Sequence, residues 1–207
     1  MHWSIVRIFA AQYHLILIMQ NIEPFARWEK LYIASEDSNS LFYGENHNEF
    51  LCRNTIYNHY IHPKWDDFGS KTLYLKILFV SYEQQFAIIE LMGEWNDCLY
   101  NDIMHLKRTV IENLEDNGIQ KFILIGENVL NFHYSDDAYY EDWFNDIDDG
   151  WIIAVNFRQH IIEEFDKINL NYYILYGGKL NSVKWRTLSP VQLYNALNQY
   201  ANTALNP

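Results

Sequence analysis

The chain has 207 residues, a formal net charge of −12 and 49% apolar residues, with only eight Gly and four Pro. That length suits one domain with a full core, and the composition excludes disordered, collagen-like and low-complexity classes. The excess of acids argues against sequence-independent binding to nucleic acid and against binding to an anionic membrane surface, because both attract Lys and Arg.

The first 18 residues, "MHWSIVRIFAAQYHLILI", are too short and too polar to span a membrane, and no small-residue cleavage motif follows them. We interpret residues 1–18 as a poorly structured or spuriously translated leader. A weak secretion signal and an amphipathic edge element are the alternatives. Cys52 and Cys98 are the only cysteines and lie far apart in the sequence. They indicate neither a disulfide framework nor a cysteine zinc site, so we expect a reducing, cytoplasmic location.

Residues 19–71 predict an irregular, β-rich N-terminal extension, in which "LYIASED" and "FLCRNTIYN" are short strand-like runs between polar turns. Clearer signals begin at Thr72, where we place the start of an α/β domain over residues 72–207. Residues 72–80 and 86–92 are two β-type runs joined by a short polar connection, so they predict an antiparallel hairpin.

The segment after this hairpin predicts a helix that Gly118 ends, because one apolar stripe runs through Leu99, Ile103, Leu106, Val110 and Leu114. Further along the chain we expect strands at 121–125, 151–157 and 171–176. Helices are expected at 139–147, near 159–168 and after Pro190. Strands that alternate with helices predict an α/β fold with a mixed, mostly parallel sheet, an initial antiparallel β-hairpin and flanking helices.

Polar side chains follow the expected ends of the parallel strands, where open α/β sheets usually meet ligands and partners. We predict a ligand- or partner-binding site from these residues: Glu94, Asn96, Asp97, Glu127, Asn128, His133, Asn156, Arg158 and His160. Each also has a structural interpretation, such as a helix cap for Asp97 or an ion pair for Arg158. Glu94 and Glu127 are the strongest candidates, because two carboxylates at adjacent strand ends repel unless a cation such as Arg158 lies between them.

The same strand ends offer an enzymatic alternative. The two glutamates with His133 or His160 provide an acid and a base, or a hard-metal site together with Asp97. Such sets arise easily by chance among 27 acids and eight His. The sequence contains no phosphate-binding loop, no dinucleotide-binding motif and no nucleophile elbow. We therefore predict no catalytic residue, metal or cofactor.

The segment from Tyr134 to Gly150 holds seven acids and no Lys or Arg, interleaved with five aromatic residues. It is either a solvated acidic loop whose aromatic residues cover the core, or a contact surface. Aromatic residues anchor interfaces and clustered acids attract a basic partner. The second interpretation predicts an unknown protein partner with a basic surface.

The order of a β-hairpin, three helix–strand units and a closing helix over residues 72–200 resembles the STAS domains of anti-sigma-factor antagonists and sulfate-transporter tails. Gly93-Glu94-Trp95-Asn96-Asp97 is similar to that family's Gly-Glu-x-Asp motif, with one residue more before the Asp. The resemblance implies a phosphorylation site near Ser135, although Asp136 and Asp137 stand where the family has Gly. It favours a non-enzymatic regulatory or protein-interaction domain over a small-molecule or metal-dependent enzyme.

Overall fold

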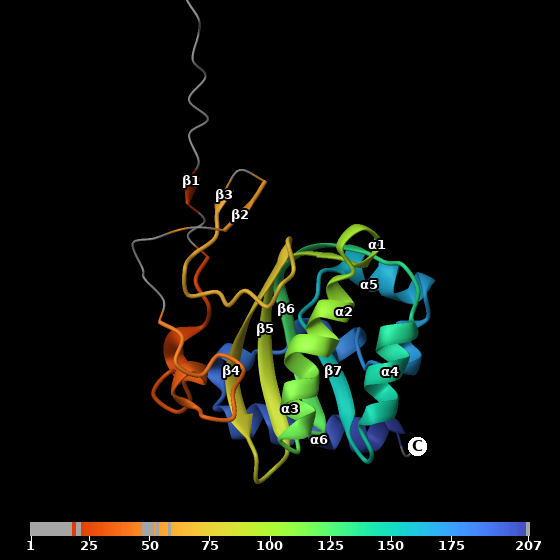
Figure 1. Cartoon of the computed structure of the whole chain (residues 1–207). Helices are drawn as coiled ribbons and strands as arrows, with labels where there is room; N and C mark the ends of the chain where they lie inside the picture. The colour runs from red at the N-terminus through yellow and green to blue at the C-terminus, as the bar shows by residue number, and fades with distance from the viewer. Residues whose placement is uncertain (1–17, 20–21, 47–51, 53, 58, 206–207) are drawn as a thin grey trace, which may run out of the picture.

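The computed structural model describes residues 18–19, 22–46, 52, 54–57 and 59–205, which are arranged as in Figure 1. A four-stranded sheet lies at the centre, in the order β4-β5-β6-β7. Its strands are β4 (Leu73–Ser81), β5 (Phe86–Asn96), β6 (Lys121–His133) and β7 (Trp151–Val155). β4 is antiparallel to β5, whereas β5, β6 and β7 run parallel. The predicted α/β fold, with a mixed, mostly parallel sheet and an initial antiparallel hairpin, is therefore confirmed.

The central strands are buried on both faces, which explains their near-continuous apolar sequences. Side chains on one face pack under the segment 97–116, α4 (Ala138–Asp146) and α5 (Gln159–Lys167). Side chains on the other face pack under α6 (Pro190–Leu205). Figure 1 shows α3, α4 and α6 around the sheet. All three parallel strands consequently end at one edge of a covered sheet.

The connection from β5 to β6 is one interrupted helix. It consists of α1 (Asp97–Tyr100), α2 (Asp102–His105), the π-helical η3 (Leu106–Ile111) and α3 (Glu112–Asp116). The left-handed backbone of Asn101, with φ 53°, separates α1 from α2 and leaves Leu99 72% exposed. The predicted stripe is therefore wrong at Leu99 and confirmed at its four later positions, which are at most 1% exposed. Gly118, with φ +85°, follows the helix end, as predicted.

The segment predicted as a last strand, residues 171–176, is not a strand. It contains the end of a 3-10 helix, η4 (Leu170–Tyr172), and a single β-bridge between Leu175 and Ile153 of β7. The 3-10 turn directs Leu170 into the core and leaves Tyr172 exposed, so only Leu175 reaches the sheet. Two further 3-10 helices, η5 (Gly178–Ser182) and η6 (Trp185–Thr187), lead to α6.

The N-terminal strap, defined as residues 22–46, wraps the outer edge of β4 (Figure 1). Its regular elements are the 3-10 helices η1 (Ala26–Trp28) and η2 (Ala34–Glu36), so the strand predicted at "LYIASED" is wrong. Trp28 joins the hydrophobic cluster under α6, whereas Ala34 and Phe42 join the cluster on the opposite face. The strap therefore closes both layers of the core beside the edge strand.

A small second sheet accounts for the β-structure predicted near "FLCRNTIYN". It contains β1 (Ile18–Met19), β2 (Thr55–Ile56) and β3 (His59–Tyr60), in the order β1-β3-β2. The leader predicted for residues 1–18 lies outside the described residues, apart from Ile18, which pairs with His59.

Candidate functional site

The predicted strand-end residues lie at the ends of the strands only in part. β5 continues to Asn96 and β6 to His133, beyond the predicted ends at residues 92 and 125, so Glu94, Glu127 and Asn128 lie within strands. Asn96 of β5 is in register with His133 of β6, and Asn156 directly follows β7. A hydrogen bond of 2.8 Å between His160 Nε2 and the carbonyl oxygen of Leu130 joins α5 to β6. The neighbouring parallel strands therefore bring Asn96 and His133 together, whereas the contacts of the other predicted residues have to be taken one by one.

Glu94 and Glu127 do not face each other. The β5–β6 register shifts twice, between Glu90 and Met92 and again between Gly93 and Glu94. As a result Glu94 pairs with Asn131, whose side-chain amide donates to Glu94 Oε1 at 2.9 Å. Glu94 is only 9% exposed. The two carboxylates are therefore not the repelling neighbours that we expected, and each accepts hydrogen bonds from its own donors.

Glu127 is fixed by three side chains from two other segments, η6 and the residue that follows β7. Its Oε1 accepts hydrogen bonds from Trp185 Nε1 at 2.7 Å and from Asn156 Nδ2 at 2.8 Å. Its Oε2 accepts from Arg186 Nη2 at 2.7 Å. Partial burial raises the pKa of Glu127, but the hydrogen bonds from Arg186, Asn156 and Trp185 outweigh burial and hold the pKa below its usual range.

The cation beside Glu127 is Arg186, not Arg158. Arg158 is exposed and stands at the N-cap of α5 without a side-chain capping bond. Arg186 comes from η6, where its guanidinium stacks over the Trp185 ring at 4.4 Å and over the Phe25 ring at 5.4 Å. Since Arg186 lies 59 residues after Glu127 along the chain, a prediction based on the strand ends could not identify this arginine.

A fully buried carboxylate, Glu90, adjoins the same arginine. Glu90 Oε2 accepts a hydrogen bond from the backbone N–H of Phe25 at 2.8 Å, which ties the strap to β5. Glu90 Oε1 accepts from Asn128 Nδ2 at 3.2 Å and from Arg186 Nη2 at 3.4 Å. Burial raises the pKa of Glu90 to about 7, although the bonds from Phe25 and Arg186 lower it in part. An acid inside the apolar run "FAIIELM" was the signal that sequence reasoning missed.

A buried acidic pair, Asp97 and Asp102, lies where β5 enters the helix. Asn96, not Asp97, caps α1, because its side chain accepts from the Leu99 N–H at 2.9 Å. Asp97 instead accepts from Trp95 Nε1 at 3.0 Å, from the Ile103 N–H at 2.8 Å and from the Tyr140 hydroxyl at 2.6 Å. Burial raises the pKa of Asp97 to about 7, against the effect of these hydrogen bonds.

Asp102 is the other member of this pair and is also buried. It accepts from the hydroxyls of Ser70 at 2.7 Å and Thr72 at 3.1 Å, and from the Asn96 N–H at 2.7 Å. Burial raises the pKa of Asp102, opposed by these hydrogen bonds. The hydroxyl and amide donors thus fix the β5–α1 corner, which makes this pair a structural element of the fold.

A shallow surface hollow of about 360 Å³ lies at the strand ends. Its lining residues come from α1, the end of β6 and α5: Cys98, Asn131, Phe132, His133, Tyr134, His160, Glu163 and Glu164. Among the described residues, no three His, Cys, Asp or Glu side chains are placed to hold a metal ion. Ser135 is exposed in the loop that precedes α4.

The acidic aromatic segment is divided between core and surface. Tyr140 and Trp143 are at most 1% exposed, whereas Phe144 is 39% exposed. Phe144 lies 6.1 Å, between ring centroids, from Tyr173, which in turn lies 6.5 Å from Tyr172. Tyr172, at 72% exposure, is the most exposed of the three.

Two carboxylates, those of Asp137 and Glu141, lie close enough to Tyr173 to affect its hydroxyl group. The Tyr173 hydroxyl donates to Asp137 Oδ2 at 2.9 Å, and Asp137 and then Glu141 raise the pKa of Tyr173. We define Asp137, Glu141, Phe144, Tyr172 and Tyr173 as the acidic aromatic surface. Sequence reasoning found its α4 part and missed the two tyrosines, because their segment was predicted to be a strand.

Comparison with protein-family models and with curated proteins finds no match to this chain. Across the part of the chain that the structure describes, no helix is long and apolar enough to cross a membrane.

Proposed function

We propose that this protein is a non-enzymatic interaction domain, and that its acidic aromatic surface binds a basic segment of a partner protein. One observation carries the proposal. Phe144 and Tyr172, from separate segments of the chain, are both exposed, and Tyr173 joins them, because its ring lies 6.1 Å from that of Phe144 and 6.5 Å from that of Tyr172. The carboxylates of Asp137 and Glu141 act on the same Tyr173.

The composition of this surface matches that of protein interfaces. Large aromatic side chains are enriched at interfaces and supply much of the binding energy, because they bury much area with few rotatable bonds. The carboxylates Asp137 and Glu141 complement Lys or Arg on a partner and favour its approach at low salt. The charge of −12 over the whole chain acts in the same direction.

The contacts of the predicted strand-end carboxylates favour this function over the enzymatic alternative. Glu127 accepts hydrogen bonds from three side chains, and Glu94 accepts one from Asn131. Such bonds lower the free energy of the folded state and leave less capacity to bind a substrate or metal. A STAS-like identity, which implies regulation by protein contact, and a cytoplasmic location belong to the same proposal.

Selection of peptides from a random display library tests the proposal. We expect the selected peptides to combine Lys or Arg with an apolar anchor. Replacing both exposed rings, Phe144→Ala with Tyr172→Ala, should weaken their binding at least about tenfold, which corresponds to about 1.4 kcal/mol. Asp137→Asn with Glu141→Gln should weaken binding and reduce its dependence on salt.

A matched control uses Tyr43→Ala with Glu83→Gln, which removes an exposed ring and an exposed acid far from this surface in the sequence. The control should bind the selected peptides as the unmodified protein does. Equal binding by the control and by the Phe144→Ala/Tyr172→Ala variant would refute the proposal, as would selected peptides without basic residues. Thermal melts confirm that each variant is folded.

A further inference from the structure

The first part of the strap is held to the sheet by the buried carboxylate of Glu90. Glu90 Oε2 accepts a hydrogen bond from the Phe25 N–H at 2.8 Å, and Glu90 is 0% exposed. The Phe25 ring lies 4.7 Å, between centroids, from the ring of Trp185, and the Arg186 guanidinium lies over the Phe25 ring at 5.4 Å. Phe25 therefore links the strap both to β5 and to η6.

Glu90 shares its nearest cation with a second carboxylate. Arg186 Nη2 lies 2.7 Å from Glu127 Oε2 and 3.4 Å from Glu90 Oε1. Asn128 Nδ2, at 3.2 Å from Glu90 Oε1, adds a neutral donor. The arginine is closer to the more exposed carboxylate, since the Glu127 side chain is 29% exposed and that of Glu90 is 0% exposed. An ionised Glu90 is therefore a buried charge that Arg186 compensates only in part.

The other charged groups around Glu90 have partners of their own. Lys76 of β4 is the cross-strand partner of Glu90, and Lys76 Nζ donates to Asp66 Oδ1 at 3.0 Å. On the strap, Arg27 Nη1 donates to the carbonyl oxygen of Arg186 at 3.2 Å. The helix α6, which covers this face of the sheet, has no Asp, Glu, Lys or Arg. The two carboxylates and one arginine therefore decide the charge balance at Glu90.

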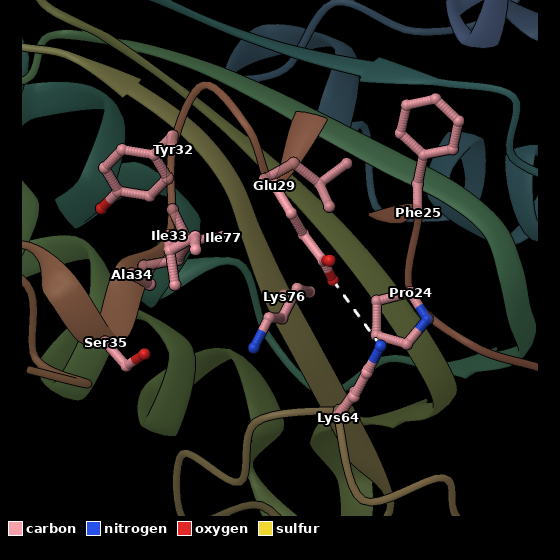
Figure 2. Close-up of a pocket in the computed structure, with 11 residues that line it drawn as sticks. Pro24, Phe25, Glu29, Tyr32, Ile33, Ala34, Ser35, Lys64, Lys76 and Ile77 are labelled. Atoms are coloured by element: carbon pink, nitrogen blue, oxygen red, sulfur yellow. Dashed lines mark ion pairs between the residues drawn. The ribbon is translucent and has the colours of Figure 1, made fainter. Parts of the chain in front are cut away.

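A cavity lies beside the bond between the strap and Glu90. It has a volume of about 130 Å³ between the strap and β4, and Phe25 and Lys76 both line it. Figure 2 shows this cavity, with Pro24 and Phe25 on the strap, Lys76 on β4 and the ion pair between Glu29 and Lys64. A volume of this size has room for water. Packing is therefore incomplete next to Phe25, which lowers the cost of a local opening there.

We propose that residues 22–29 of the strap form a pH-controlled cover, which is closed over Glu90 while its carboxyl group is protonated and opens when the group ionises. Opening brings Glu90 into water, and a carboxylate gains far more from hydration than a neutral carboxyl group does. A protonated carboxyl group still has an oxygen that accepts from the Phe25 N–H, so the closed form keeps this bond. Release of Phe25 uncovers one side of the Trp185 ring, which is 0% exposed in the closed form. The cover shares no residue with the acidic aromatic surface and does not rest on the function proposed above.

The pKa of Glu90 supports the direction of this switch. Burial raises the pKa from 4.5 to about 7, against the effects of the Phe25 hydrogen bond and of Arg186. The closed form therefore binds the proton more tightly than an open form in which Glu90 is solvated. The advantage of the closed form is complete below about pH 4.5 and is lost as pH rises through about 7. With these values, the equilibrium constant for opening rises about tenfold from pH 6 to pH 8.

Amide hydrogen exchange of the full chain at pH 6 and pH 8 tests the proposal, after each rate is divided by the intrinsic rate at the same pH. The N–H groups of Phe25 and Glu29 are hydrogen-bonded in the closed strap. Their protection against exchange should fall about tenfold at the higher pH. Equal protection at the two pH values would overturn the proposal.

Three variants assign the effect to Glu90. Glu90→Gln is neutral at both pH values and should protect the two amides equally at pH 6 and pH 8. Glu127→Gln removes the carboxylate that shares Arg186, so the pH at which the strap opens should move down, because the charge of Glu127 raises the pKa of Glu90. Glu163→Gln, at an exposed acid on α5, is the matched control and should behave as the unmodified protein does. A loss of protection that persists in Glu90→Gln would overturn the assignment, as would an upward shift in Glu127→Gln.

Discussion

Replacing Asp97 with Asn should make the protein more stable at alkaline pH. Asp97 is 3% exposed, and burial raises its pKa from 3.8 to about 7. The amide of Asn resembles the protonated carboxyl group in shape and lack of charge. Its oxygen can still accept from Trp95 Nε1 and the Ile103 N–H, so the variant retains two of the three hydrogen bonds.

The magnitude follows from the pKa. A rise from 3.8 to about 7 corresponds to about 4 kcal/mol, since each pKa unit is worth about 1.4 kcal/mol. The folded protein binds this proton more tightly than the unfolded chain, so the free energy of unfolding falls as pH rises through that interval. The Tyr140 hydroxyl loses its acceptor in the variant, which costs about 1 kcal/mol. Asp97→Asn should therefore stabilise the protein by about 3 kcal/mol above pH 7.

Urea denaturation at a series of pH values measures this effect. Glu90 titrates in the same direction in both proteins and cancels in the difference between variant and unmodified protein, which therefore reports on Asp97 together with its neighbour Asp102. The difference should grow as pH rises from about 4 to about 8. A difference that does not change over this range would refute the reasoning. Asp97→Ala is the control for packing, and should destabilise at every pH because it leaves three donors without an acceptor.

Two further predictions concern the strand ends. Glu127→Ala should destabilise the protein by about 2 to 4 kcal/mol, because three side-chain donors lose their acceptor. Glu94→Ala removes one such hydrogen bond and should cost about 1 kcal/mol. Urea denaturation compares the two variants, and a larger loss of stability in Glu94→Ala would contradict the assigned contacts. Gly93→Ala should cost more than about 3 kcal/mol, because a Cβ there lies 2.2 Å from the carbonyl oxygen of Thr72 at φ +118°. Gly118→Ala, which has φ +85° but open space around it, is the comparison and should cost about 1 kcal/mol in thermal or chemical denaturation.

Regular elements with strong local patterns were predictable. The runs that begin β4 to β7 are mostly apolar because both faces of the sheet are covered there, and this made the strands recognisable in the sequence. The helices α4, α5 and α6 were recognised by their apolar spacing for the same reason. Where the local pattern was weaker the prediction failed, as at Leu99, which the left-handed turn of Asn101 directs into solvent.

The contacts of individual polar side chains were not predictable in this way. Asn96 and His133 meet because their strands pair in register, but two register shifts separate Glu94 from Glu127. Arg186, which pairs with Glu127, lies 59 residues further along the chain. Its position follows from the burial of the neighbouring Trp185 beneath the strap, where that ring packs against Trp28.

The sequence by itself therefore determined the α/β class and the order of the elements from the hairpin β4–β5 to the helix α5. These features depend on burial patterns within short segments. Only the tertiary structure decided which cation reaches which carboxylate, that the strap covers β4, and that Tyr173 lies beside both Phe144 and Tyr172. The physical reason is that such contacts depend on strand register and on the paths of loops between distant segments, which are fixed only when the whole core packs.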